Sequence, residues 1–187
     1  ESAAGSRFDE EADSIMSGRR ATTTLAALAV LAVTAWLLRP VPPGDLAYGQ
    51  TASLQVVDRR GELLREVLST RQGRGRWVQL EHVSPYVIDA VLAAEDIRFY
   101  SHPGIDPIAV ARAAWHNLRA RRIVSGASTI TQQTAQLLYG DGGLGRGWAA
   151  KLREAGLALR LEVWLSKDEI LTHYLNRAPF GNQVFGI

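Results

Sequence analysis

Two glutamates occupy faces of predicted helices that are otherwise apolar. The first, Glu95, follows apolar residues at helical spacings of seven, four and three: Ile88, Val91 and Leu92. We therefore expect its carboxylate to project along the apolar face and to be partly desolvated. Desolvation disfavours the charged form of a carboxyl group, which suits a general acid or base that works near neutral pH. The alternative is a glutamate at a helix end that turns into solvent or pairs with Arg98.

The second glutamate, Glu154, precedes apolar residues at spacings of four, seven and eleven: Ala158, Leu161 and Leu165. Lys151 lies one turn earlier on the same face. Two inward glutamates suggest a carboxylate pair beside a cleft, as in enzymes that transfer or hydrolyse sugars. The simpler alternative is an ion pair between Lys151 and Glu154, which are three residues apart.

A third candidate element is the segment from Ser125 to Gln133, which reads SGASTITQQ. Its small residues allow close approach of the backbone to a ligand, and a helix is predicted to begin within it. Amides at a helix N-terminus bind phosphate or pyrophosphate. Four side chains add further hydrogen-bonding groups: Ser128, Thr129, Gln132 and Gln133. Three arginines lie just upstream: Arg119, Arg121 and Arg122. The alternative is an ordinary helix cap with a tight turn.

Five helices are predicted to position these residues. Ser84 and Pro85 begin a helix with its apolar face at Val87, Ile88, Val91 and Leu92. Asp106 and Pro107 begin another, with an apolar stripe at Ile108, Ala111, Trp115 and Leu118. Thr129 and Gln132 match a capping box for a helix to about Leu138. A long helix is expected over 148–165, and the capping box of Ser166 and Glu169 begins the last, with Ile170, Leu171, Tyr174 and Leu175 inside.

The remaining segments define the predicted domain organisation. Residues 53–68 alternate in a way that indicates a β-hairpin with its turn at 59–61. Residues 21–38 are 18 uncharged, mostly apolar positions between arginines, which predicts an uncleaved transmembrane anchor rather than a signal peptide. Basic residues before it place the tail, 1–20, in the cytoplasm and the rest outside. Residues 39–52 form a proline-rich linker, and 53–187 form a mainly α domain with a small β element.

Composition excludes several classes of protein. The 187 residues carry a net charge of +2 and no cysteine, so a polyanionic or polycationic chain, a disulfide framework and a thiol nucleophile are all excluded. The RARR sequence before STITQQ superficially resembles a helix-turn-helix. An exported domain does not meet DNA, so we expect no nucleic-acid partner.

Four ordered motifs resemble those of the family 51 peptidoglycan glycosyltransferases, the polymerase domains of class A penicillin-binding proteins and monofunctional transglycosylases. They read AEDIRFYSHPG (94–104), GASTITQQ (126–133), KLREAGLALRLE (151–162) and KDEILTHYLN (167–176). The GRW at 75–77 and YLNRAPFGN at 174–182 look most like the 1C type. The resemblance implies a lysozyme-like fold. Because the chain stops at Ile187, inside the family's last motif, the domain is expected to be an incomplete N-terminal piece of a longer protein.

The resemblance implies polymerisation of lipid II into glycan strands with release of undecaprenyl pyrophosphate. Glu95 matches the general base and Glu154 the second glutamate. Residues expected to bind substrate are Asp96, Phe99, His102, Ser128, Thr129, Gln132, Gln133, Lys151 and Arg153. A divalent cation, Mg²⁺ or Mn²⁺, is implied at the pyrophosphate, although the sequence indicates no ligand cage. Expected partners are lipid II, the nascent strand, the bacterial inner membrane and other cell-wall synthesis proteins.

The chain departs from the family pattern at Ala127, where glycine is usual, and at Ala150, where a cation usually precedes Lys151. Losing one cation weakens the case for tight pyrophosphate binding. Two alternative functions therefore remain: an inactive, membrane-anchored fragment that binds glycan or a partner, and a lysozyme-like muramidase that uses the same carboxylates.

Overall fold

The computed structural model describes residues 22–47, 53–67, 74–140, 147–181 and 184–186. The chain divides into two units, Glu1–Arg39 and Pro40–Ile187. In the first unit, residues 22–37 are helical. Among the described residues, none of the helices combines the length and apolar character needed to cross a membrane. The predicted span begins at residue 21, which lies outside the described ranges, as does the predicted tail.

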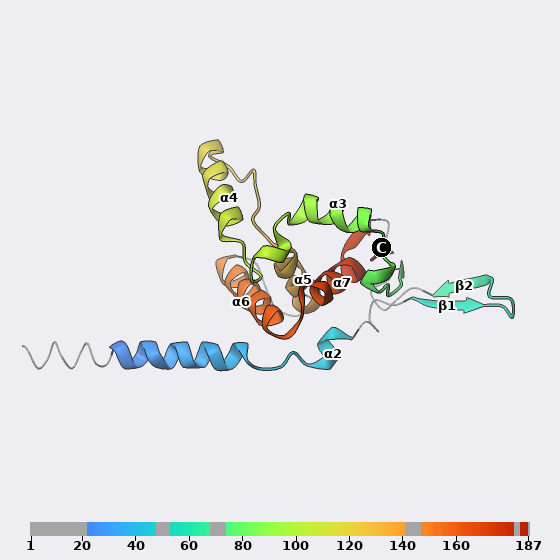
Figure 1. Cartoon of the computed structure of the whole chain (residues 1–187), viewed down its shortest axis with the longest axis horizontal. Coiled ribbons are helices and arrows are strands. Elements are labelled where there is room, and N and C mark those ends of the chain that lie inside the picture. The colour runs from blue at the N-terminus through green and yellow to red at the C-terminus, as the bar shows by residue number, and fades with distance from the viewer. Residues whose placement is uncertain (1–21, 48–52, 68–73, 141–146, 182–183, 187) are drawn as a thin grey trace, which may run out of the picture. The chain divides into compact units, whose positions relative to one another are not determined.

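The second unit is mainly helical (Figure 1). Its helices are α2 (Pro43–Leu46), α3 (Pro85–Glu95), α4 (Pro107–Ala120), α5 (Ile130–Tyr139), α6 (Trp148–Trp164) and α7 (Lys167–Arg177), with short 3₁₀ turns η1 (Leu80–His82) and η2 (Phe99–Ser101). Strands β1 (Leu54–Val57) and β2 (Leu63–Val67) form the predicted antiparallel hairpin. A smaller sheet, which the sequence did not predict, contains β3 (Arg74–Gly75), β5 (Val184–Phe185) and β4 (Pro179–Gly181) in that order.

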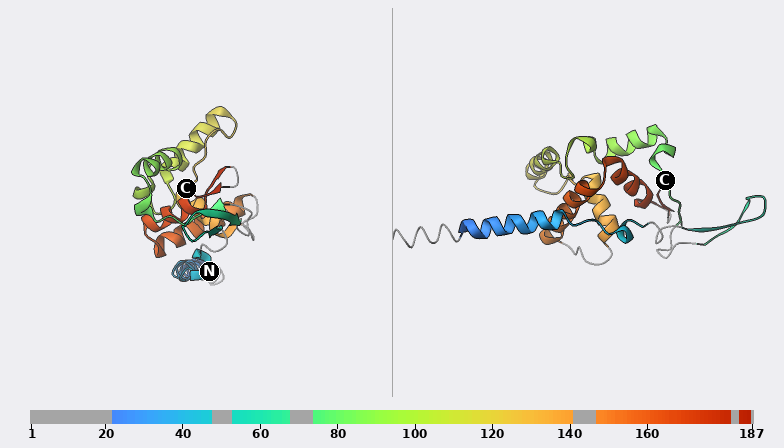
Figure 2. Two further views of the ribbon diagram at one scale, coloured as in Figure 1. Left: turned by 90° about the vertical axis from the view of Figure 1, so that its right-hand side faces the viewer. Right: turned by 60° about the horizontal axis from the view of Figure 1, so that its bottom comes forward.

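The core lies where α5 packs against both α6 and α7 (Figures 1 and 2). The apolar residues predicted for α7 are buried, and Leu161 of α6 and Ile130 of α5 have no exposed surface. Both predicted capping boxes, at Thr129 with Gln132 and at Ser166 with Glu169, are present. The helical periodicity of the apolar positions therefore located these helices correctly, because the predicted apolar faces are the ones that pack against each other.

The predicted inner face of α4 is wrong. Ile108, Trp115 and Leu118 are 61%, 63% and 74% exposed, while the buried residues of this helix are Ala109 and Ala113. Figure 1 shows α4 extending away from α5, α6 and α7. Only small side chains permit its close approach to the rest of the unit, so the alanines face inward and the larger residues do not.

The apolar face of α3 is also more open than predicted. None of its residues is fully buried; Ile88, Val91 and Leu92 are half-buried and Val87 is exposed. Ser84 occupies the position before Pro85 as expected, but its side chain makes no capping hydrogen bond. The helix thus covers the edge of the unit rather than its centre.

The end of α7 holds the segment that precedes α3. Asn176 is fully buried; its Oδ1 accepts from the Val78 amide at 2.6 Å and its Nδ2 donates to the Val78 and Thr172 carbonyls at 2.8 and 2.7 Å.

Two further residues of α7, His173 and Arg177, contact the preceding segments. The ring of Trp77 packs edge-on against His173. Burial and the neighbouring Arg177 charge lower the pKa of His173 to about 4, so this ring is neutral near pH 7. Arg177 also donates to the Leu46 carbonyl of α2 at 2.7 Å.

We predict that Asn176→Ala lowers the free energy of unfolding by about 3 kcal/mol, because it leaves the buried polar groups of Val78 and Thr172 without their partner. Urea unfolding followed by circular dichroism would measure the loss. Gln136→Ala, at an exposed position of α5, is the control and should change the value by less than about 0.5 kcal/mol. Equal losses in the two variants would contradict the assigned role of Asn176.

Candidate active site

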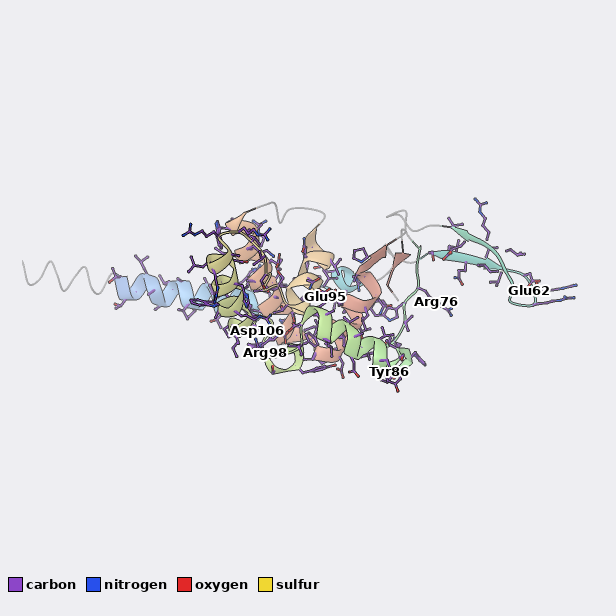
Figure 3. All side chains as sticks on the ribbon, turned by 90° about the horizontal axis from the view of Figure 1, so that it is seen from above. Glu62, Arg76, Tyr86, Glu95, Arg98 and Asp106 are labelled. Carbon is purple, nitrogen blue, oxygen red and sulfur yellow. The ribbon has the colours of Figure 1, made fainter. Side chains whose placement is uncertain are left out.

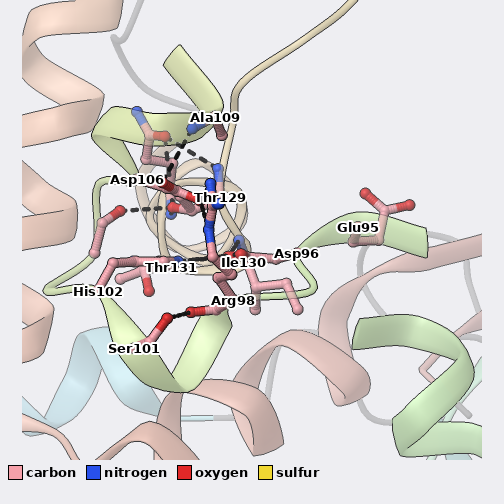
Figure 4. A network of polar contacts seen from close by, with 12 residues as sticks. Glu95, Asp96, Arg98, Ser101, His102, Asp106, Ala109, Thr129, Ile130 and Thr131 are labelled. Carbon is pink, nitrogen blue, oxygen red and sulfur yellow. Dashed lines mark hydrogen bonds and ion pairs between the residues drawn. The ribbon is translucent and has the colours of Figure 1, made fainter. Parts of the chain in front are cut away.

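Asp96 connects the end of α3 to the start of α5. It follows the last residue of α3 and is 7% exposed. Its Oδ2 accepts a hydrogen bond from the Ile130 amide at 3.0 Å, and both carboxylate oxygens lie 3.1 Å from Nε2 of His102 (Figure 4). The first and second motifs therefore share one buried carboxylate.

The start of α5 is capped from two sides. The Thr129 hydroxyl accepts from the Gln132 amide at 3.1 Å and donates to the Gly104 carbonyl at 2.6 Å. The Gln132 side chain accepts from the Thr129 amide at 3.1 Å. Both residues are buried. Their side chains thus act as caps, which is the structural alternative considered from the sequence.

These caps correct one part of the prediction for this segment. The amides of Ile130 and Gln132 were expected to be open to a phosphate, but the Asp96 carboxylate and the Thr129 hydroxyl already accept from them. An anionic carboxylate also occupies the positive end of the helix dipole. Two amides at the N-terminus of α5 are therefore satisfied within the chain, which favours ligand contacts from the exposed side chains around it.

Glu95 lies beside this network but faces the other way. It is exposed, so the expected partial desolvation is wrong. Figure 4 shows its side chain directed away from Asp96, and Figure 3 places it in the same region as Arg98 and Asp106. The Gln133 amide donates to its Oε2 from 2.8 Å. Glu95 and Asp96 diverge because α3 ends between them.

A cleft of about 260 Å³ lies next to Glu95. It is bounded by the end of α3, the start of α4 and the loop before α5; its polar lining residues are Glu95, Asp96, Arg98, Asp106, Arg112, Ser128 and Thr129. Burial opposes ionisation of Asp106, but hydrogen bonding from the Ala109 amide and from Arg98 outweighs it and holds the pKa of this carboxyl below its usual value. The cleft wall therefore carries fixed charges of both signs.

Lys151 connects Glu154 to the loop before α5. The Lys151 Nζ lies 3.2 Å from the Ser128 hydroxyl and donates to both oxygens of Glu154 at 2.8 and 3.0 Å. Glu154 is buried, as predicted, whereas Lys151 and Arg153 are exposed. The two glutamates are thus linked to opposite ends of one segment, Glu154 through Ser128 and Glu95 through Gln133.

A second ion pair joins Glu162 of α6 to Lys167 of α7, with side chains that are 12% and 19% exposed. Glu162 Oε1 accepts from Thr131 at 2.6 Å and from Lys167 at 2.7 Å. The Lys167 Nζ also donates to the His102 carbonyl at 2.6 Å and lies 4.4 Å from the centre of the buried Phe99 ring. Phe99 and His102 therefore both contact the lysine of this ion pair. The sequence did not identify Glu162 or Lys167 as site residues, because neither stands out by spacing.

The described residues offer one buried group with the spacing of a metal site: Asp96, His102 and Asp106, whose ligand atoms lie within 4.8 Å of one another. The group does not fit a divalent cation. Arg98 donates to Asp106 at 2.6 Å, and Asp96 already pairs with His102 and the Ile130 amide. A hard cation needs several oxygen ligands that are not shared with a guanidinium.

Comparison with known proteins identifies the family to which the chain belongs. A family model described as Transglycosylase matches residues 60–187. The chain therefore belongs to the transglycosylase family, which confirms the resemblance seen in the motifs.

Three relatives illustrate the similarity. Penicillin-binding protein 1C of Escherichia coli (strain K12) is 48% identical over 110 residues, which are 59% of this chain and 14% of that protein. The biosynthetic peptidoglycan transglycosylase of Shigella boydii serotype 4 (strain Sb227) is 47% identical over 112 residues, 59% of this chain and 45% of that protein. Its counterpart in Salmonella arizonae (strain ATCC BAA-731 / CDC346-86 / RSK2980) is 46% identical over 112 residues. The chain thus spans less than half the length of these relatives.

We predict that Gly104→Ala lowers the free energy of unfolding by about 2 kcal/mol. Gly104 has φ of +86°, and a Cβ there would lie 2.9 Å from the Glu162 side chain and 3.2 Å from the Ala158 carbonyl oxygen. Both the left-handed backbone and the contact are unfavourable for alanine.

Gly126→Ala is the matched control for thermal or urea unfolding, because a Cβ at Gly126 would meet nothing within 4 Å. Its free energy of unfolding should stay within about 0.5 kcal/mol of wild type. A tolerated alanine at position 104 would show that the turn can move away from α6.

Proposed function

We propose that this chain carries a peptidoglycan glycosyltransferase that polymerises lipid II, with a lysozyme-like helical domain as its scaffold. The observation that carries the proposal is Glu95: an exposed carboxylate beside a cleft, in a chain of the transglycosylase family. The names of the relatives, which include peptidoglycan transglycosylases, support the same substrate class.

In the proposed reaction, Glu95 acts as the general base. It takes the proton from the 4-hydroxyl of an acceptor lipid II while that oxygen attacks C1 of the donor sugar. The bond between C1 and the pyrophosphate oxygen breaks, and undecaprenyl pyrophosphate leaves as an anion. A sugar hydroxyl is a weak nucleophile and needs a base, so the exposure of Glu95 to the cleft supports this role.

The leaving group needs positive charge and hydrogen-bond donors rather than an acid. Lys151 and Arg153 are exposed on α6, and Lys151 reaches Ser128 at the cleft. We assign these three residues to the pyrophosphate. Glu154 is buried and holds the Lys151 ammonium in place, with both of its carboxylate oxygens accepting from Nζ. Mg²⁺ or Mn²⁺ stays a prediction, with the substrate phosphates as its main ligands.

We also propose that residues 21–38 anchor the domain to the bacterial inner membrane with the catalytic domain outside. The helix over 22–37 and its exposed apolar residues, among them Leu25, Leu28, Val30 and Leu31, support this placement. Partners among other cell-wall synthesis proteins stay a prediction.

We predict that Glu95→Gln lowers the rate of polymerisation about 10³-fold, because the amide cannot accept the proton. Radiolabelled lipid II would be incubated with the purified full-length protein in detergent, and the strands separated by gel. Asp89→Asn is the control: it removes an exposed carboxylate from the same helix, one turn and a half away, and should leave the rate unchanged.

The products separate the alternatives. Longer lipid-linked strands support the glycosyltransferase, whereas soluble muropeptides released from preformed glycan would indicate a muramidase. Binding of lipid II without any product would indicate an inactive fragment. Equal polymer from Glu95→Gln and wild type would remove Glu95 as the base.

A further inference from the structure

Tyr174 is linked to the proposed base, Glu95, through a single residue, Gln133. It is on α7, is 7% exposed, and its hydroxyl donates to Gln133 Oε1 at 3.4 Å. The other end of the same amide, Nε2, donates to Glu95 at 2.8 Å. Three helices thus contribute to one hydrogen-bonded chain that runs from the core to an exposed carboxylate.

The amide in the middle of this chain has two possible orientations. With Nε2 toward Glu95 it donates to the ionised carboxylate; turned by 180° it would place the Oε1 lone pairs against that charge. The ionised Glu95 carboxylate can only accept hydrogen bonds, so it favours the first orientation. In that orientation Oε1 faces Tyr174, whose hydroxyl donates to it and holds the far end of the amide in place.

Tyr174 keeps that proton throughout the physiological range. Burial, followed by the nearby negative charge of Glu95, raises the pKa of Tyr174 to about 12. The charge of Glu95 acts on this hydroxyl because the two groups are the ends of one hydrogen-bonded chain through Gln133.

We propose that Tyr174 is a positioning residue for glycosyl transfer: its hydroxyl fixes the Gln133 amide so that Nε2 faces Glu95 and orients that carboxylate for proton abstraction. This inference rests on the proposed function. Glu95 is the last residue of α3 and is exposed, so its side chain has several rotamers to choose from. A directed hydrogen bond reduces that freedom before substrate binds, which lowers the barrier that remains.

Tyr174→Phe removes the hydroxyl and retains the ring. We expect kcat for lipid II polymerisation to fall about tenfold while KM stays within about twofold, since the lost hydrogen bond orients the base and does not bind substrate. Tyr139→Phe is the matched control. Tyr139 is a half-buried tyrosine of α5, six residues after Gln133, and its pKa is also raised to about 12. It should retain wild-type kcat. Unchanged kcat in Tyr174→Phe, or an equal fall in both variants, would overturn the inference.

A double-mutant cycle tests whether Tyr174 acts through Gln133. Gln133→Met keeps the length of the side chain and removes both amide groups. In that background Tyr174→Phe should have no further effect on kcat, because the amide that it orients is absent. Multiplying effects would mean that Tyr174 acts by another route and would overturn the inference.

A readout without turnover separates this inference from the proposed function. In protein labelled with ¹⁵N-glutamine, the side-chain NH₂ of Gln133, assigned by its loss in Gln133→Met, should exchange with solvent several times faster in Tyr174→Phe than in wild type and Tyr139→Phe. If wild type makes no polymer but this difference is found, the function fails and the positioning stands. If polymer forms and the exchange rates are equal, the positioning fails alone.

Discussion

The buried carboxylate of Asp96 holds together the segments that form the cleft. It satisfies the first amide of α5 and pairs with His102, which returns the chain from η2 toward α4. Since the Asp96 side chain is 4% exposed, losing either partner would leave a buried carboxylate only partly compensated. The position of Glu95 is fixed relative to α5 because its neighbour along the chain is tied there.

The same arrangement explains how adjacent acids acquire opposite roles. Asp96 has φ of −161° and lies outside the helix, so its side chain turns inward toward α5. Glu95 is still helical and points outward, where Gln133 meets it. One carboxylate caps the positive end of a helix, and the other is open to solvent, as the proposed general base must be. The two side chains point in different directions because α3 ends between them.

Two ion pairs connect the remaining motifs. Glu162 and Lys167 tie α6 and the start of α7 to the His102 carbonyl, and Glu154 holds Lys151 beside Ser128. Ion pairs of this kind contribute little net stability once desolvation is counted. Their value here is geometric, because each fixes the distance between a cleft residue and the helix behind it. The proposed transfer, in which a hydroxyl and a leaving group must be oriented, needs such fixed distances.

Local patterns in the sequence determined the helix starts, the inner faces of α5, α6 and α7, the hairpin and the family. Capping boxes and apolar periodicity act within a few residues, so they can be read without knowing the fold. Only the tertiary structure decided that Glu95 is exposed, that α4 turns Trp115 and Leu118 outward, and that Asp96 occupies the end of α5 that seemed open to phosphate. It also revealed Glu162, Lys167 and Tyr174. These contacts join residues 31 to 65 positions apart in the chain, on elements whose crossing is set by packing, and no local signal encodes which polar groups will then meet.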